Sequence, residues 1–282
     1  MASPHPPTHI NPALFASTTV LAVHAHPDDE AIFTGGVLAT AAQAGADVHV
    51  VTATLGEEGE TFGTQLAGLV ADHADQLGGY RYHELVRSLS ILRATGHFLG
   101  GAGYWRDSGM EGPTRPHRRC ALIDSGEEAL HHLQAVVDEI RPDILITYDE
   151  YGTYGHRDHI RVYDLFMGVS LPANTEVWCV VTDPDDLAAS QGRIVAAPWP
   201  LPQPGEIMTS TAATHVLALD ASGYRAKVAA MQAHETQIWF ADGTVSPIHP
   251  DPVTAQGPDA VYCLTNRIAR AVSRQEFFHR VR

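Results

Sequence analysis

The sequence predicts an α/β fold, a Rossmann-like three-layer sandwich built on a mostly parallel sheet, on two observations. The first observation is the order of three segments near the N-terminus. Residues 18–23 form a largely apolar run of strand length, and residues 48–54 form a second such run. Between them, the Ala-rich residues 30–44 end at Gly45. Glycine commonly ends a helix, so this order is strand, helix, strand. Two strands joined by one helix at such short spacing run parallel in one sheet.

The second observation is the same order further along the chain. Residues 127–140 place apolar side chains on one helical face and stop before Pro142, and residues 143–149 read as a buried strand. The other elements expected, in chain order, are helices over 65–77 and 82–93 separated by Gly78 and Gly79, a strand from 98, a helix from about 159, a strand over 214–220 and a helix over 223–234.

One domain should contain nearly the whole chain. A length of 282 residues is ample for a full α/β core. We expect a single domain over 18–282 behind a flexible, proline-containing leader over 1–17. Residues 184–204 carry five prolines and little periodicity, which predicts an irregular surface excursion before a less regular C-terminal part.

Composition restricts the partners. Lys and Arg total 18 against 33 Asp and Glu, a net charge of −15 that would repel nucleic acid and anionic membranes. The three cysteines are scattered, which excludes a disulfide framework and a cysteine zinc site. Neither a secretory signal nor an apolar run of about 18 residues is present. We therefore expect a cytoplasmic protein with a small-molecule substrate and make no prediction of oligomeric state.

Two loops hold most of the side chains capable of chemistry. Residues 24–30 read His-Ala-His-Pro-Asp-Asp-Glu and follow the first predicted strand, and residues 148–159 follow the strand over 143–149. Active sites of open parallel sheets lie beyond the carboxyl ends of the strands. The two loops should therefore face each other.

The residue types in these loops suit a divalent metal. His26 and Asp29 stand at i, i+3 at a helix start, where both side chains can point at one ion, although acids there could simply stabilise the helix N-terminus. His156 and His159 have the same spacing, which alone leaves open which of them binds metal. Imidazole and carboxylate ligands suit a borderline metal, and such a set leaves positions free for water and substrate.

The remaining groups in the loops suit hydrolysis of a stable bond. Asp28 is the nearest spare carboxylate and could act as general base. Tyr154 could donate a hydrogen bond to the developing oxyanion. His156 could protonate the leaving amine, oriented by either Asp158 or Asp149.

At these residues the sequence resembles the LmbE/PIG-L superfamily of zinc deacetylases. The hallmarks of that superfamily, A-H-P-D-D-E and H-x-D-H, stand at 25–30 and 156–159. Further stretches narrow the resemblance to the deacetylases of mycothiol biosynthesis (the MshB type). They are residues 54–60, 71–81, 99–103 and 105–110.

This resemblance implies a zinc-dependent N-deacetylase that converts N-acetylglucosaminyl-myo-inositol to glucosaminyl-inositol and acetate. Two departures bear on substrate identity: Arg157 stands where close relatives usually have proline, and residues 170–214 match poorly. The resemblance assigns zinc to His26, Asp29 and His159, the general base to Asp28, carbonyl polarisation to Tyr154, an acid or electrostatic role to His156 with Asp158 behind it, and the substrate hydroxyls to Arg81 and Asp107 with Glu60 nearby.

Four alternatives remain at this point. Within the same class, the chain could be a mycothiol S-conjugate amidase or a natural-product amino-sugar deacetylase. From another class, two histidines and a carboxylate also describe the Fe²⁺ site of an oxygenase, and Fe²⁺ shares the ligands of Zn²⁺. A nucleotide-binding module would need a G-x-G-x-x-G loop after the first strand, and none is present.

Overall fold

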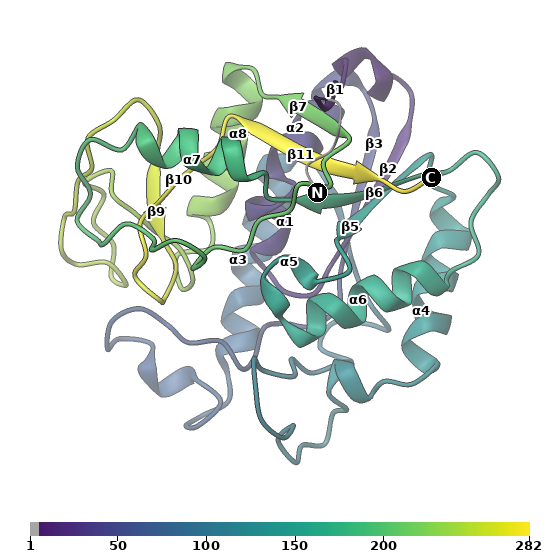
Figure 1. Ribbon diagram of the computed structural model, residues 1–282. Helices are drawn as coiled ribbons and strands as arrows, with labels where there is room; N and C mark the ends of the chain where they lie inside the picture. The colour runs from purple at the N-terminus through teal and green to yellow at the C-terminus, as the bar shows by residue number, and fades with distance from the viewer. Residues whose placement is uncertain (1–5) are drawn as a thin grey trace.

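The computed structural model describes residues 6–282, and its centre is a sheet in the order β1-β7-β11-β6-β5-β2-β3-β4 (Figure 1). Among these described strands only β11 runs antiparallel to its neighbours. The predicted α/β fold with a mostly parallel sheet is therefore confirmed. The strands are β1 (Thr8–His9), β2 (Thr19–His24), β3 (Asp47–Thr52), β4 (Thr95–Phe98), β5 (Ile144–Tyr148), β6 (Glu176–Val181), β7 (His215–Ala218) and β11 (Gln275–Arg280).

Helices cover both faces of this sheet. On one face α2 and α3 pack with α8, and on the other α4 packs with α6 (Figure 1). Right-handed crossovers from strands that progress in opposite directions produce this arrangement. The helices are α1 (Asp29–Ile32), α2 (Gly35–Ala44), α3 (Leu77–Leu92), α4 (Glu128–Ile140), α5 (Gly152–Gly155), α6 (Arg157–Gly168), α7 (Pro184–Gly192) and α8 (Ala221–Gln232), with 3₁₀ turns η1 (Pro12–Phe15), η2 (Ala67–Leu69) and η3 (Leu122–Asp124).

The sheet reverses its direction of growth between β2 and β5. From β2 the chain adds β3 and then β4 on one side, whereas β5 lies on the other side of β2 and is followed outward by β6. All five residues of β5 are buried, which explains why this segment shows no polar alternation. A reversal of this kind leaves a crevice beyond the carboxyl ends of the two central strands, where ligands bind in open α/β sheets.

The prediction of a helix over 65–77 is wrong, because within this range only η2 is helical before α3 begins at Leu77. Helix α3 also runs through Gly78, which was expected to separate two helices. A Cβ at Gly78 would stand 2.8 Å from the Cγ of Glu57, so this glycine permits close packing and does not end a helix.

The described part of the predicted flexible leader is built into the fold. Strand β1 pairs in parallel with β7 at the sheet edge. The side chain of Phe15 is fully buried and meets Trp178 edge-on, with ring centroids 6.1 Å apart. This segment was not recognisable from sequence, because its few apolar residues, Ile10 and Phe15 among them, follow neither a helical nor a strand period. Residues 1–5 lie outside the described residues.

The segment predicted as an irregular excursion over 184–204 contains helix α7. The side chain of Asp183 caps it by accepting hydrogen bonds from the backbone of Asp185 and Asp186, both at 3.0 Å, and Pro184 occupies the first turn. The C-terminal part adds a small antiparallel sheet of β8 (Trp239–Phe240), β9 (Val261–Cys263) and β10 (Arg270–Ala271). Across residues 6–282, no helix combines the length and the apolarity that crossing a membrane requires.

Candidate metal centre

Two histidines and one aspartate converge where the loops after β2 and β5 meet. The Nδ1 atom of His26 and the Nε2 atom of His159 lie 3.3 Å apart. The Oδ2 atom of Asp29 lies 3.4 Å from the former nitrogen and 3.3 Å from the latter. The three atoms thus form a nearly equilateral triangle, although His26 and His159 are 133 positions apart in the chain.

This triangle fits a divalent ion. Ligands held at about 2.0–2.1 Å in tetrahedral geometry lie roughly 3.3 Å from one another, which is the separation found here. The three residues are at most 6% exposed. His26, Asp29 and His159, the residues to which the family resemblance assigns the metal, could therefore hold an ion with little rearrangement.

The outward nitrogens of both imidazoles are held by acceptors. The Nδ1 atom of His159 faces the carbonyl oxygen of Gly152 at 3.2 Å, and the Nε2 atom of His26 faces the Oδ2 atom of Asp158 at 3.3 Å. A proton on each outward nitrogen leaves the inward nitrogen with a free lone pair. Both rings are therefore oriented for metal binding.

The centre is rich in negative charge. Burial by itself lowers the pKa of His26, but the nearby carboxylates of Asp107, Asp158 and Asp29 outweigh it and raise this pKa well above its ordinary value. Positive charge at this point is therefore strongly stabilised. A metal cation would meet the same field.

His156 adjoins the same cluster but presents itself differently. One nitrogen from each of His26, His156 and His159 lies within 4.8 Å of the others. However, His156 is the N-cap of α6, and its Nδ1 atom accepts a hydrogen bond from the backbone N–H of Asp158 at 3.1 Å. Burial and the two neighbouring imidazoles lower the pKa of His156 to about 3. It is therefore a neutral ring whose proton resides on Nε2, pointing away from the capped backbone.

Asp28 combines a strained backbone with a perturbed carboxylate. Its φ is 109°, a conformation rare outside glycine. Its carboxylate lies 3.2 Å from a guanidinium nitrogen of Arg81. Burial raises the pKa of Asp28 to about 7, since the opposing effect of Arg81 is smaller. A carboxyl group with this pKa suits proton transfer near neutral pH.

Arg81 lies behind Asp28 and is only 3% exposed. Its guanidinium also donates to the carbonyl oxygens of Pro27 and Gly56. The resemblance assigns Arg81 to the substrate hydroxyls, and in the structure its guanidinium contacts Asp28, Pro27 and Gly56. Arg81 joins the first loop to the segment after β3 and contacts the carboxylate of Asp28.

The carboxylate of Asp158 contacts His26, although the sequence placed it behind His156. It also accepts a hydrogen bond from the backbone of Ser108 at 2.9 Å. Asp107, expected at the substrate, is buried as well, with its Oδ1 atom 3.5 Å from the Nε2 atom of His26. The carboxylates of Asp107 and Asp158 therefore both face the Nε2 atom of His26.

Comparisons with known proteins decide the family. Residues 21–170 match the PIG-L family, described as GlcNAc-PI de-N-acetylase. A Corynebacterium diphtheriae protein named 1D-myo-inositol 2-acetamido-2-deoxy-alpha-D-glucopyranoside deacetylase is 46% identical over 260 residues, or 89% of this chain and 88% of that protein. A Corynebacterium efficiens protein of the same name is 45% identical over 269 residues, or 92% and 86%. The chain belongs to the PIG-L family.

A solved structure agrees on the fold. The zinc inhibited form of teicoplanin deacetylase superposes with a TM-score of 0.51 at 21% identity, covering 77% of this chain and 84% of that chain. At this identity the likeness concerns architecture, and the deacetylase assignment depends on the closer relatives and on the site.

In this PIG-L chain, Tyr154 stands at the mouth of the centre with 43% of its surface exposed. Its ring stacks on Phe33, with centroids 6.5 Å apart, and meets His159 edge-on at 4.9 Å. The preceding Thr153 has a φ of 60°, so the loop holds Tyr154 through a locally strained turn. Glu60, the third residue expected near substrate, is exposed.

Two aromatic residues at the centre of this PIG-L chain, Tyr148 and Phe33, are not marked by any sequence pattern. Tyr148, the last residue of β5, is fully buried and hydrogen-bonds Asp29, and Phe33 packs against three rings around the centre. Both residues read as ordinary core aromatics, and no spacing rule separates them from the rest of the core. The position of Tyr148 at the carboxyl end of a central strand was the one available signal.

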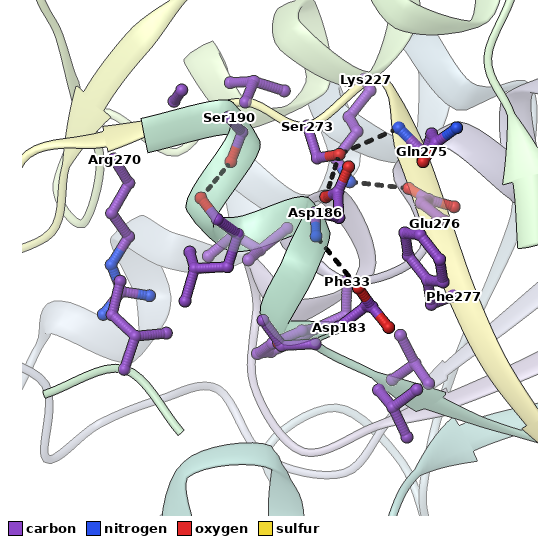
Figure 2. A pocket seen from close by; sticks show the side chains of 18 of the residues that line it. Phe33, Asp183, Asp186, Ser190, Lys227, Arg270, Ser273, Gln275, Glu276 and Phe277 are labelled. Carbon is purple, nitrogen blue, oxygen red and sulfur yellow. Dashed lines mark hydrogen bonds and ion pairs between the residues drawn. The ribbon is translucent and has the colours of Figure 1, made fainter. Parts of the chain in front are cut away.

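A cavity of about 120 Å³ lies on another side of Phe33 in the PIG-L fold, between α7 and β11 (Figure 2). Its wall includes a buried ion pair, Lys227 to Glu276 at 2.7 Å, whose carboxylate also accepts hydrogen bonds from the first turn of α2. None of the predicted site residues lines this cavity. It is therefore separate from the metal centre, and its charged pair serves to anchor α2.

Proposed function

We propose that this chain hydrolyses the acetamide of 1D-myo-inositol 2-acetamido-2-deoxy-α-D-glucopyranoside, releasing acetate and the free amine. The relatives named for that activity are 45–46% identical over most of their length. The observation that carries the proposal is the triangle of His26, Asp29 and His159, with an unusually basic carboxyl group, Asp28, beside it. Such a set suits metal-assisted hydrolysis of an amide.

We propose His26, Asp29 and His159 as the ligands of a divalent ion, with Zn²⁺ as the first candidate and Fe²⁺ as the second. Two imidazoles and one carboxylate suit either ion. When bound, the ion would supply Lewis acidity, lowering the pKa of a water molecule and polarising the acetyl carbonyl.

Asp28 is proposed to move the proton. In the carboxylate form it takes a proton from the attacking water as the C–O bond forms. It then gives that proton to the nitrogen as the C–N bond breaks, so that the amine leaves neutral. The ion pair with Arg81 keeps the carboxylate in one orientation throughout, at a nitrogen-to-oxygen distance of 3.2 Å.

His156 and Tyr154 are proposed to stabilise the oxyanion. The low pKa of His156 disfavours an imidazolium, so its electrostatic role is better supported than that of a general acid. As a neutral ring with its proton on Nε2, it can donate a hydrogen bond to the developing charge, and the phenol of Tyr154 can add a second. Asp158 is then proposed to orient the imidazole of His26, whose Nε2 atom it contacts at 3.3 Å.

The substrate hydroxyls are proposed to meet the loops that carry Arg81, Asp107 and Glu60. Glu60 is exposed and could contact the hydroxyls directly, whereas the buried Arg81 and Asp107 would act mostly by shaping these loops. The further proposals are a single domain that contains residues 18–282 together with β1 and η1, a small amino-sugar substrate as the partner, and a cytoplasmic location.

An assay that measures both released acetate and the freed glucosaminyl amine tests the proposed function. The metal-loaded protein is offered the named inositol glycoside, free N-acetylglucosamine and a mycothiol bimane conjugate. We expect fastest turnover of the inositol glycoside. Preferred cleavage of the conjugate would replace the deacetylase with the S-conjugate amidase, and activity that required oxygen and a 2-oxoacid would overturn hydrolysis.

A further inference from the structure

We propose that Tyr148 is a positioning residue that holds two of the metal's ligands at once, Asp29 through its hydroxyl group and His159 through its ring. The inference rests on the proposed function in taking these two residues as ligands. It concerns a buried tyrosine that neither the sequence patterns nor the hydrolytic roles use.

The hydroxyl of Tyr148 joins the first loop to the carboxylate. It donates to the Oδ2 atom of Asp29 at 2.6 Å and accepts a hydrogen bond from the backbone N–H of Ala25 at 2.7 Å. The same Oδ2 atom accepts the backbone N–H of His26 at 2.9 Å. Two donors therefore fix the one carboxylate oxygen that faces both imidazole nitrogens.

The ring of Tyr148 aligns the second ligand. It stacks on the imidazole of His159, with centroids 4.0 Å apart and planes within 3° of parallel. Phe33 and His24 meet the tyrosine edge-on, at 5.8 and 5.3 Å. Because the tyrosine is clamped from several sides, the imidazole plane is fixed by packing as well as by its hydrogen bond to Gly152.

Filling the core with an aromatic ring would not by itself need the hydroxyl group. A buried hydroxyl is costly unless it is partnered, and a phenylalanine would fill nearly the same space. Here both hydrogen-bonding capacities of the hydroxyl are used, and one is directed at a metal ligand. Groups that orient metal ligands in this way set the affinity and the geometry of the ion.

The test replaces Tyr148 by phenylalanine in the full chain. Zn²⁺ affinity is measured by competition with a chelating dye, and the visible spectrum of the Co²⁺-loaded protein reports ligand geometry. We expect Y148F to bind Zn²⁺ about 10- to 100-fold more weakly and to give an altered Co²⁺ spectrum.

Tyr224→Phe is the matched control. The hydroxyl of Tyr224 also accepts a backbone N–H, that of Ala260 at 2.8 Å, and the side chain is 8% exposed, but it touches no ligand of the proposed metal. Both variants lose a backbone acceptor, so both should be less stable without metal. Only Y148F should change the affinity and the spectrum.

Zn²⁺ affinity and a Co²⁺ spectrum like those of the unaltered protein would overturn the proposal. Should Y148F fail to fold, 3,5-difluorotyrosine at position 148 keeps the shape and makes the hydroxyl a stronger donor. A changed Co²⁺ spectrum then supports the proposal, and an unchanged one contradicts it. Because these readouts need no substrate, an absence of deacetylation would defeat the proposed function and leave this result standing.

Discussion

Asp28 adopts a backbone conformation that costs free energy, and its neighbours show what holds it there. Its backbone N–H donates to Glu30 at 3.0 Å. The guanidinium of Arg81 binds both the carbonyl oxygen of the preceding Pro27 and the carboxylate of Asp28 itself. Glu30 in turn is hydrogen-bonded to His234 at 2.7 Å. Strain held by several partners at one residue is typical of functional sites, and here it aims the carboxylate beside the proposed ion.

Asp28→Asn tests the base. Asparagine tolerates a positive φ and can still accept a hydrogen bond from Arg81, so the fold and the bound metal should persist. We expect kcat to fall by about 10²–10⁴, the usual contribution of a positioned base. Acetate release and metal content are measured together. Loss of the metal would place Asp28 among the ligands.

Arg81→Gln separates two roles for the arginine. Since Arg81 contacts Asp28 from behind, its loss should displace the base and lower kcat, by up to about 10², with little change in KM. Arg87→Gln, on the same helix with its side chain 54% exposed, is the control and should behave like the unaltered protein. A raised KM at unchanged kcat would instead place Arg81 in the substrate pocket.

The sequence located these residues better than it located their contacts. The two loops were recognisable because strand ends, acids and histidines at i, i+3 coincide there. The partner of Asp158 could not be recognised from sequence, because whether its carboxylate reaches His26 or His156 depends on how α6 is rotated against β2. Tyr148 was hidden for a similar reason, since burial on both faces of β5 removes the polar signal that marks a functional position.

At the scale of elements, the first turn of α6 holds the loop after β4. The backbone of Ser108 donates to Asp158 at 2.9 Å, and the guanidinium of Arg157 donates to the carbonyl oxygen of Gly112 at 2.7 Å. The loop carries Asp107 against His26 at 3.5 Å. The helix that supplies His159 therefore also fixes the loop across the site.

Arg157→Pro should loosen that loop and leave the helix intact. Proline is well tolerated in the first turn of a helix, so α6 should still start normally. We expect KM to rise by about three- to tenfold with kcat nearly unchanged, because substrate binding and not the reacting groups is disturbed. Arg161→Ala is the control, since that side chain binds Ser125, between η3 and α4, at 3.1 Å and does not contact Ser108 or Gly112. Equal KM values in the two variants would contradict the assignment.

The elements that were predicted incorrectly show the limits of local patterns. The helix expected over 65–77 has enough helix-forming residues, yet the chain there forms turns, and Gly78 serves close packing against Glu57. Strand β1 exists only because the edge of β7 offers it a partner. Propensity carries no information about such tertiary contacts, whereas the long apolar strands β2, β3 and β5 were recognisable from sequence alone.

At the scale of the whole molecule, the proposed ion would join parts of the chain that fold far apart in sequence. His26 follows β2 and His159 lies on α6, 133 positions later, so the ion would link the two halves of the sheet at its switch point. A ligand that binds only the folded state stabilises it, by about 2.7 kcal/mol at a concentration 100 times Kd.

We therefore expect Zn²⁺ added to chelator-treated protein to raise Tm by several degrees and to restore acetate release. His159→Ala should lose both effects, and His73→Ala, an exposed histidine elsewhere, should keep them. Full activity in metal-free protein, or an equal rise in Tm for His159→Ala, would show that the triangle does not hold the ion.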